Sequence, residues 1–158
     1  MGGGITYWLQ RWTRQIDRTE EREALAIGLA AEIEAYVELV ESRNHGATVR
    51  QIISTLRNGQ DVMLSQLLPI PGTVKNYFPL FFAQLEKIGI LCENTSELAK
   101  FYTRLSGVFA TLTSINAGHF DKLPIANKIS LLEEELKLWE NTLRGGRAVA
   151  IQLKITTK

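Results

Sequence analysis

The residue types that most often perform catalysis or bind metals are scarce in this sequence. Its 158 residues include two histidines, His45 and His119, and one cysteine, Cys92. His119 and Asp121 share a short predicted loop, where a histidine and a carboxylate could exchange protons with a substrate. No nucleophile in a recognisable setting accompanies them, so we expect them to cap the loop. Cys92 follows an apolar segment, and we expect a buried, unreactive thiol.

Metal and phosphate sites are not indicated by the remaining spacings. Glu41 and His45 are four residues apart, but His45 falls where the predicted helix should end, so we interpret it as a polar helix end. Glu133, Glu134 and Glu135 are consecutive, and consecutive helical side chains point in different directions, which favours a solvated acidic face. The glycine-rich segments lack the Lys-Ser/Thr pair that follows a phosphate-binding loop. We therefore expect a non-enzymatic protein without a cofactor or a metal.

The composition is typical of a folded globular protein. Hydrophobic residues make up 45% of the chain, and 18 Lys+Arg against 17 Asp+Glu give a net charge of +1. The apolar fraction excludes wholesale disorder. The balanced charge and the sparse basic residues between 43 and 57 give no surface of the kind that nucleic acids require, so we expect no nucleic-acid partner.

Apolar residues at helical spacing predict an all-α, single-domain helical bundle. The three long helices are predicted at about residues 5–44, 95–116 and 124–153, and the two short ones at about 49–58 and 79–88. No alternation of the kind that strands show persists along the chain.

Capping residues and glycines predict where these helices end. Gly46 is expected to end the first helix, and Thr48 to begin the next. Asn94 is expected to cap the fourth helix through a capping box, and Gly145-Gly146 to interrupt the last one. Residues 60–78, which contain two prolines, are expected to form a short helical turn and an ordered loop against the body.

The start of the chain shows the order of residues found where a transmembrane helix leaves the membrane on its cytoplasmic side. Glycines and aromatic residues come first, and four arginines spaced three or four apart follow. One hypothesis is that residues 2–9 are the tail of a membrane anchor. The alternative is a flexible start and a solvated basic stripe, which nearby acidic residues favour. We therefore divide the chain into 1–22, an anchor remnant or projecting basic stalk, and 23–158, the bundle. The membrane-proximal residues are Tyr7, Trp8, Arg11, Trp12, Arg14 and Arg18.

The most aromatic segment of the chain surrounds Pro79. It is either buried under the preceding loop or exposed as a contact surface. The candidate partner surface consists of Tyr77, Phe78, Phe81 and Phe82.

Several segments taken together support a family resemblance. They are ITYWLQR at 5–11, AAEIEAY at 30–36, NYFPL at 76–80 with IGIL at 88–91, and ELAKFYTRL at 97–105. In this order they resemble a loose group of uncharacterised bacterial proteins that have an N-terminal transmembrane helix and a cytoplasmic helical domain. The resemblance implies a cytoplasmic location with anchoring at the inner membrane, and it implies no activity.

The leading functional hypothesis is a non-enzymatic interaction module tethered to the cytoplasmic face of a bacterial membrane. Its partners would be an unknown protein, the membrane surface, or a second copy bound through the long first helix. One alternative is a soluble protein that binds a small apolar ligand in a cavity between the proline-rich loop, Phe81, Phe82 and the fourth helix. Another is an enzyme of unrecognised type that uses His119 and Asp121.

Overall fold

The computed structural model describes residues 3–68, 72–91 and 93–155, and these residues form an all-helical fold. No strand occurs within these ranges, so the predicted all-α class and its three long helices are confirmed. The elements are α1 (Gly3–Ser42), α2 (His45–Arg57), α3 (Leu64–Leu67), α4 (Val74–Tyr77), α5 (Pro79–Ala83), the 3₁₀ helix η1 (Leu85–Leu91), α6 (Asn94–Asn116) and α7 (Ile125–Ile155).

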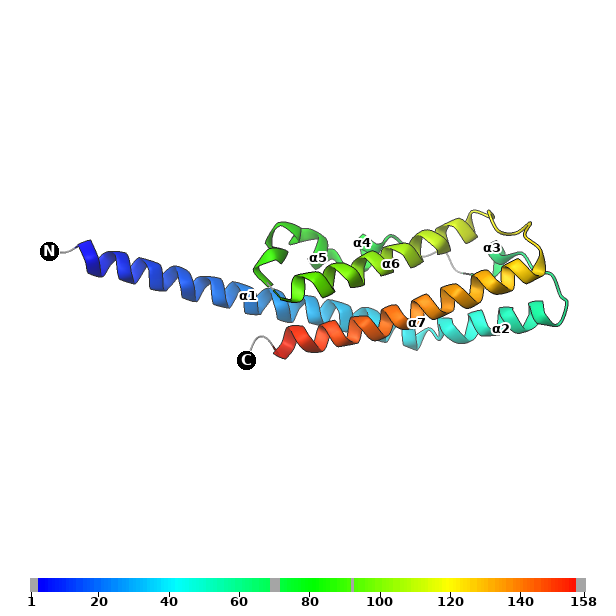
Figure 1. The fold of residues 1–158 in the computed structure, drawn as a ribbon, viewed down its shortest axis with the longest axis horizontal. Helices are drawn as coiled ribbons and strands as arrows, with labels where there is room; N and C mark the ends of the chain where they lie inside the picture. The colour runs from blue at the N-terminus through cyan, green and yellow to red at the C-terminus, as the bar shows by residue number, and fades with distance from the viewer. Residues whose placement is uncertain (1–2, 69–71, 92, 156–158) are drawn as a thin grey trace.

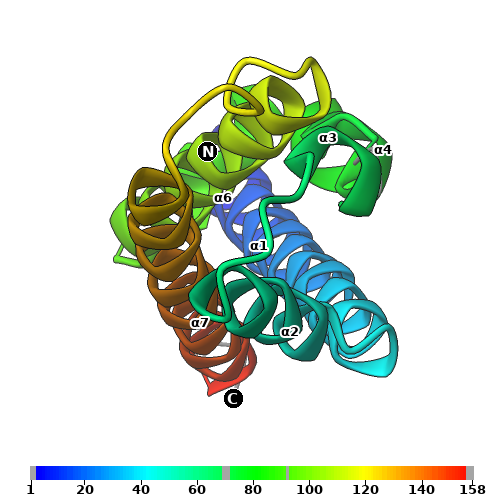
Figure 2. The same cartoon turned by 90° about the vertical axis from the view of Figure 1, so that its right-hand side faces the viewer.

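The long helices form an elongated bundle. The helices α1 and α2 follow one another along nearly the same direction, and α7 runs back along both of them (Figure 1). The helix α6 packs on α7. Of the short helices, α5 packs against α1, η1 packs against both α1 and α6, and α3 and α4 pack against α6, with α3 toward the α2 end of the bundle (Figures 1 and 2). Much of the first half of α1 extends beyond this bundle (Figure 1).

The junction between α1 and α2 differs from the predicted one. Asn44 adopts the left-handed conformation at φ 52° and ψ 36°, which asparagine tolerates better than most residues. The break therefore comes two residues before Gly46, the predicted helix end. Gly46 and Thr48 both lie inside α2, so their predicted capping roles are wrong.

The helices that precede α6 are shorter than the predicted helix over 79–88. The helix α5 ends at Ala83 and is followed by the 3₁₀ helix η1, which passes through Gly89. At the start of α6, the N-cap position is Glu93 and carries no side-chain cap hydrogen bond. Asn94, the predicted N-cap, is instead the first helical residue of α6 and is buried.

The helix α7 continues through Gly145-Gly146, where an interruption was predicted. Each glycine weakens a helix by about 1 kcal/mol relative to alanine. Gly146, however, is buried against α6, where a Cβ atom would lie only 2.6 Å from Cε2 of Phe101. The absence of a side chain thus permits a close approach of α6 and α7, and tertiary packing outweighs the low helix propensity.

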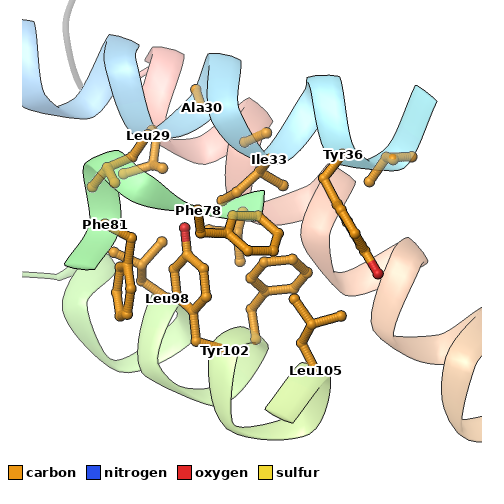
Figure 3. Packing of buried hydrophobic residues seen from close by; sticks show 14 of the residues in the cluster. Leu29, Ala30, Ile33, Tyr36, Phe78, Phe81, Leu98, Tyr102 and Leu105 are labelled. Atoms are coloured by element: carbon orange, nitrogen blue, oxygen red, sulfur yellow. The ribbon is translucent and has the colours of Figure 1, made fainter. Parts of the chain in front are cut away.

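The larger core cluster combines aliphatic and aromatic side chains, among them Phe78, which is fully buried between α1 and α6 (Figure 3). Its ring packs edge-on against the rings of Phe101 and Tyr102, at centroid distances of 5.9 and 5.0 Å. The second cluster lies toward the opposite end of the bundle. Its buried residues are Ile52, Ile53, Leu56, Leu64, Leu68, Ile115 and Leu132.

A half-buried carboxylate attaches α5 to α1. Glu32 accepts hydrogen bonds from the backbone N–H groups of Leu80, at 2.6 Å, and Phe81, at 3.1 Å. Burial raises the pKa of Glu32, while these hydrogen bonds and one from Tyr102 act against that rise. Gly28, one turn earlier, leaves room for Leu80, whose Cδ2 atom would lie 2.6 Å from a Cβ at that position.

Candidate functional site

Part of α1 has no neighbour within the bundle. Residues 14–21 are exposed, and buried side chains begin at Leu25 and Ala26. The ion pair between Lys87 and Glu21, at 2.5 Å, marks the place where the bundle first reaches α1. The division at residue 22 stays a prediction, and the change in burial occurs close to it.

The arginines of the projecting half continue the register of the core-facing stripe. Arg11, Arg14 and Arg18 are exposed, and Arg22 is half-buried. The register runs at steps of three or four through residues 11, 14, 18, 22, 25, 29, 33, 36 and 40. From residue 25 onward these positions are apolar and buried, whereas the four earlier ones are arginines. Because charged guanidinium groups resist burial without partners, the apolar seam ends where the arginines begin. The side chains of Tyr7, Trp8 and Trp12 lie outside the described residues.

The predicted partner surface is largely internal. Phe78 and Phe81 are buried, so their assignment to an exposed contact surface is wrong. Phe81 stacks on Tyr102 with a centroid distance of 3.5 Å, and Glu32 accepts hydrogen bonds from both residues. Tyr77 and Phe82 are half-buried and pack against the same core cluster.

The two residues considered for acid–base chemistry are not arranged as a pair. Asp121 accepts hydrogen bonds from the backbone N–H of Ser65, at 3.1 Å, and from the Ser65 hydroxyl. These bonds lower the pKa of Asp121 and fasten α3 to the loop before α7. His119 is exposed. Cys92 lies outside the described residues, so its expected burial is untested.

A cavity of about 100 Å³ lies where α1, α2, α6 and α7 meet. The apolar part of its wall includes Leu39, Val49, Phe109, Leu136 and Trp139. Leu68 and Tyr77, from either side of the proline-rich segment, also contribute. Neither Phe81 nor Phe82 lines this cavity, so it is not the one predicted between the proline-rich loop, these two residues and the fourth helix, and ligand binding there stays a prediction.

The polar side chains of Arg43, His45 and Glu135 also line this cavity. His45 begins α2 and packs edge-on against Trp139 at a centroid distance of 6.0 Å. Its pKa is lowered by burial and, to a smaller extent, by the charge of Arg43. No ion pair involves Arg43 or Glu135 in the part of the chain that the structure describes.

Glu135 is the residue whose surroundings differ most from the prediction. Glu133 forms an ion pair with Arg57, and Glu134 is exposed, so both lie on a solvated face. Glu135, by contrast, is half-buried. Its Oε2 atom is buried and has no hydrogen-bond partner among the described residues. Burial raises the pKa of Glu135, the neighbouring Glu134 raises it further, and a hydrogen bond with Thr111 acts in the opposite direction. Its position in the sequence could have indicated this partial burial. Glu135 comes three residues after Leu132 and four before Trp139, so it lies beside the apolar stripe of α7.

The described ranges lack two features that would point directly to a function. No group of three potential metal ligands occurs among these residues, and none of their helices is both long and apolar enough to cross a membrane. Comparison with known protein families, curated proteins and solved structures found no match to this chain.

Proposed function

We propose that this chain is a non-enzymatic helical interaction module, tethered to the cytoplasmic face of a bacterial membrane through the projecting half of α1. The observation that carries the proposal is the exposure of residues 14–21 in a helix that continues away from the bundle. Isolated helices of this length are marginally stable in water, because few interactions offset the loss of backbone entropy. A projecting helix of this kind is expected to gain its stability from something outside the chain.

The residue order within the projecting half favours a membrane surface as that external partner. Aromatic residues, which prefer the headgroup region, precede arginines, which prefer the cytoplasmic side. Residues 3–22 contain four arginines and three acidic residues, so attraction to anionic lipids is weak. The attachment would therefore depend mainly on the burial of Trp8, Trp12 and their apolar neighbours in the interface.

Flotation of the purified chain with phosphatidylcholine vesicles tests this proposal. The wild-type chain is expected to float with the vesicles. The variant Trp8→Ser/Trp12→Ser is expected to remain in the bottom fraction of the gradient. Ile27→Ser/Ile151→Ser is the matched control, because both isoleucines are more than half exposed, at 52% and 56%, and lie on the bundle. The control is expected to float like the wild type.

The same variants distinguish a membrane from a second copy of the chain. Light scattering of the lipid-free protein measures its mass, and a monomer that floats supports the proposal. If the wild-type chain is a dimer that does not float, and Trp8→Ser/Trp12→Ser is a monomer, the projecting half of α1 mediates self-association and not membrane attachment. A monomer that does not float would refute an attachment role for this segment.

A further inference from the structure

The cavity between α1, α2, α6 and α7 lies between the two core clusters of the bundle. Its wall includes Tyr36, Val40 and Phe109 from the larger cluster, and Ile115 and Leu132 from the second. The two clusters share no member among the described residues, so the hydrophobic core is interrupted where the cavity lies. Because protein interiors pack closely and contain few voids larger than a water molecule, a gap of about 100 Å³ exceeds what close packing leaves.

The wall of this cavity comes from segments that are distant in the sequence. Arg43 and His45, on either side of the left-handed Asn44, line it at the junction of α1 and α2. The opposite parts of the wall belong to α6 and α7, and Leu68 and Tyr77 add the flanks of the proline-rich segment. A ligand in the gap would therefore contact both core clusters at once, and its binding would stabilise the folded chain.

The chemistry of the wall favours an uncharged ligand. Leucine, isoleucine, valine and aromatic side chains form most of it, and they do not replace the hydration that an ion loses on binding. The charged groups at the cavity, Arg43 and Glu135, have opposite signs and together select neither a cation nor an anion. The Glu135 carboxyl already has Thr111 as a hydrogen-bond partner, and the ring of His45 packs edge-on against Trp139.

The volume of the cavity sets the size of the group that fills it. An apolar protein cavity of about 150 Å³ holds benzene, which is roughly 25 Å³ for each carbon atom. The present cavity, at about 100 Å³, therefore holds about four carbon atoms. Because the cavity is partly open to solvent, further atoms of a longer ligand would lie outside it.

We propose that this cavity binds an uncharged apolar ligand, of which a chain of about four carbon atoms fills the gap between the two core clusters. This site is independent of the proposed membrane tether, because its lining begins at Tyr36 and includes no residue of the projecting half of α1. The two proposals can therefore fail separately.

Titration of the purified chain with primary alcohols from ethanol to 1-hexanol tests the size of the site. Binding is followed by NMR through the methyl signals of Ile115 and Leu136, which line the cavity. Each CH₂ group that moves from water into apolar surroundings is expected to tighten binding about fourfold. We expect this gain for each carbon up to 1-butanol, and a gain below about twofold for each carbon beyond it, because those carbons lie outside the cavity.

Three compounds with the same four-carbon chain test the charge of the ligand. The chain ends in a hydroxyl in 1-butanol, in an ammonium in butylammonium and in a carboxylate in pentanoate. Both charged compounds are expected to bind at least about tenfold more weakly than 1-butanol, because the hydrocarbon wall does not solvate an ion.

Two valine variants test whether the ligand occupies this cavity. Val49 and Val62 are both half-buried and both pack against the second core cluster, but only Val49 lines the cavity. Val49→Leu adds one methylene to the wall, so it is expected to weaken 1-butanol binding about fourfold and to shorten the preferred chain by one carbon. Val62→Leu is the matched control and is expected to bind the alcohols like the wild type. The wild-type titrations stand without either variant if one of them fails to fold.

Three results would overturn the proposal. One is the absence of saturable shifts with 1-butanol in the folded wild-type chain. Another is an affinity that rises steadily through 1-hexanol and is the same in Val49→Leu and Val62→Leu, which would show nonspecific partitioning onto the protein surface. The third is binding of butylammonium or pentanoate that equals or exceeds that of 1-butanol, which would show that the site accepts a charged ligand.

Discussion

The adjacent glycines of α7 allow a direct test of how closely α6 and α7 pack. In Gly146→Ala, the new Cβ would lie 2.6 Å from Cε2 of Phe101 and 3.2 Å from its Cδ2 and Cζ atoms. Phe101 is 3% exposed and its ring contacts those of Phe78 and Tyr102, so it has little freedom to move away. Overpacking of this kind costs about 1–3 kcal/mol.

Gly145→Ala provides the matched control, because it makes the same chemical change one residue earlier. Its Cβ would meet only Nη1 of Arg104, at 3.9 Å, which is an ordinary contact. The gain in helix propensity is about 1 kcal/mol in both variants. Gly145→Ala should therefore stabilise the protein by about 1 kcal/mol. Gly146→Ala should range from neutral to destabilising by about 2 kcal/mol.

Urea and thermal denaturation of the two variants measure this difference directly. In a protein of this size, 1 kcal/mol corresponds to about 2–4 °C in Tm, so the two midpoints should differ by roughly 2–12 °C. Gly146→Ala that is as stable as Gly145→Ala would refute the reasoning, because it would show that α6 and α7 have room for a methyl group. A loss of stability in both variants would instead indicate that the two glycines are needed for the backbone of α7.

Three further predictions concern polar side chains that are half-buried or buried. Glu32→Ala leaves two backbone N–H groups at the start of α5 without their acceptor and should destabilise the protein by about 1–3 kcal/mol in urea denaturation. Glu38→Ala, at an exposed site of the same helix, should change the free energy of unfolding by no more than about 0.5 kcal/mol. Equal losses of stability in Glu32→Ala and Glu38→Ala would contradict the role of Glu32 as the acceptor for the start of α5. Burial and the charge of Arg43 lower the pKa of His45 in the folded protein. The neutral form of His45 therefore favours the folded state above the ordinary histidine pKa of about 6.5. This contribution to stability is lost as the pH falls from there through the lowered pKa of the folded state. His45→Gln should therefore lose less stability than the wild type when denaturation is repeated from pH 7.5 down to about pH 5, and parallel curves would contradict this. Lys128 is 1% exposed and donates to a carboxylate and a backbone carbonyl, so Lys128→Ala should cost about 2–4 kcal/mol by the same assay, and a loss below about 0.5 kcal/mol would show that these bonds contribute little.

The long helices could be predicted from sequence because their apolar residues recur locally at helical spacing. The stripe through Leu25, Leu29, Ile33, Tyr36 and Val40 is visible without any knowledge of what it contacts. The arginines at the earlier positions of the same register are equally visible, and they underlie the predicted anchor remnant or basic stalk at residues 1–22. Helix ends were less predictable, because Asn44 and Gly46 are both plausible breaking residues and the chain uses the first.

The candidate site could not be predicted in the same way. Glu135 belongs to a run of three acidic residues, and the run by itself is typical of a solvated face. Its partial burial depends on α6 and on the α1–α2 junction, which pack against the flank of α7 from distant parts of the chain. The aromatic segment around Phe78 similarly allowed either burial or exposure, and the contacts from Glu32 and Tyr102 decided for burial.

The sequence by itself determined the helical class, the long first helix and the change from arginine to apolar residues along one face, because these depend on spacing within a single helix. Tertiary structure decided that Gly146 is a packing site, that Phe78 is core, and that a carboxyl oxygen of Glu135 is buried in a cavity wall. The physical reason is that burial and hydrogen-bond satisfaction are properties of neighbours, and the neighbours of these three residues come from other helices.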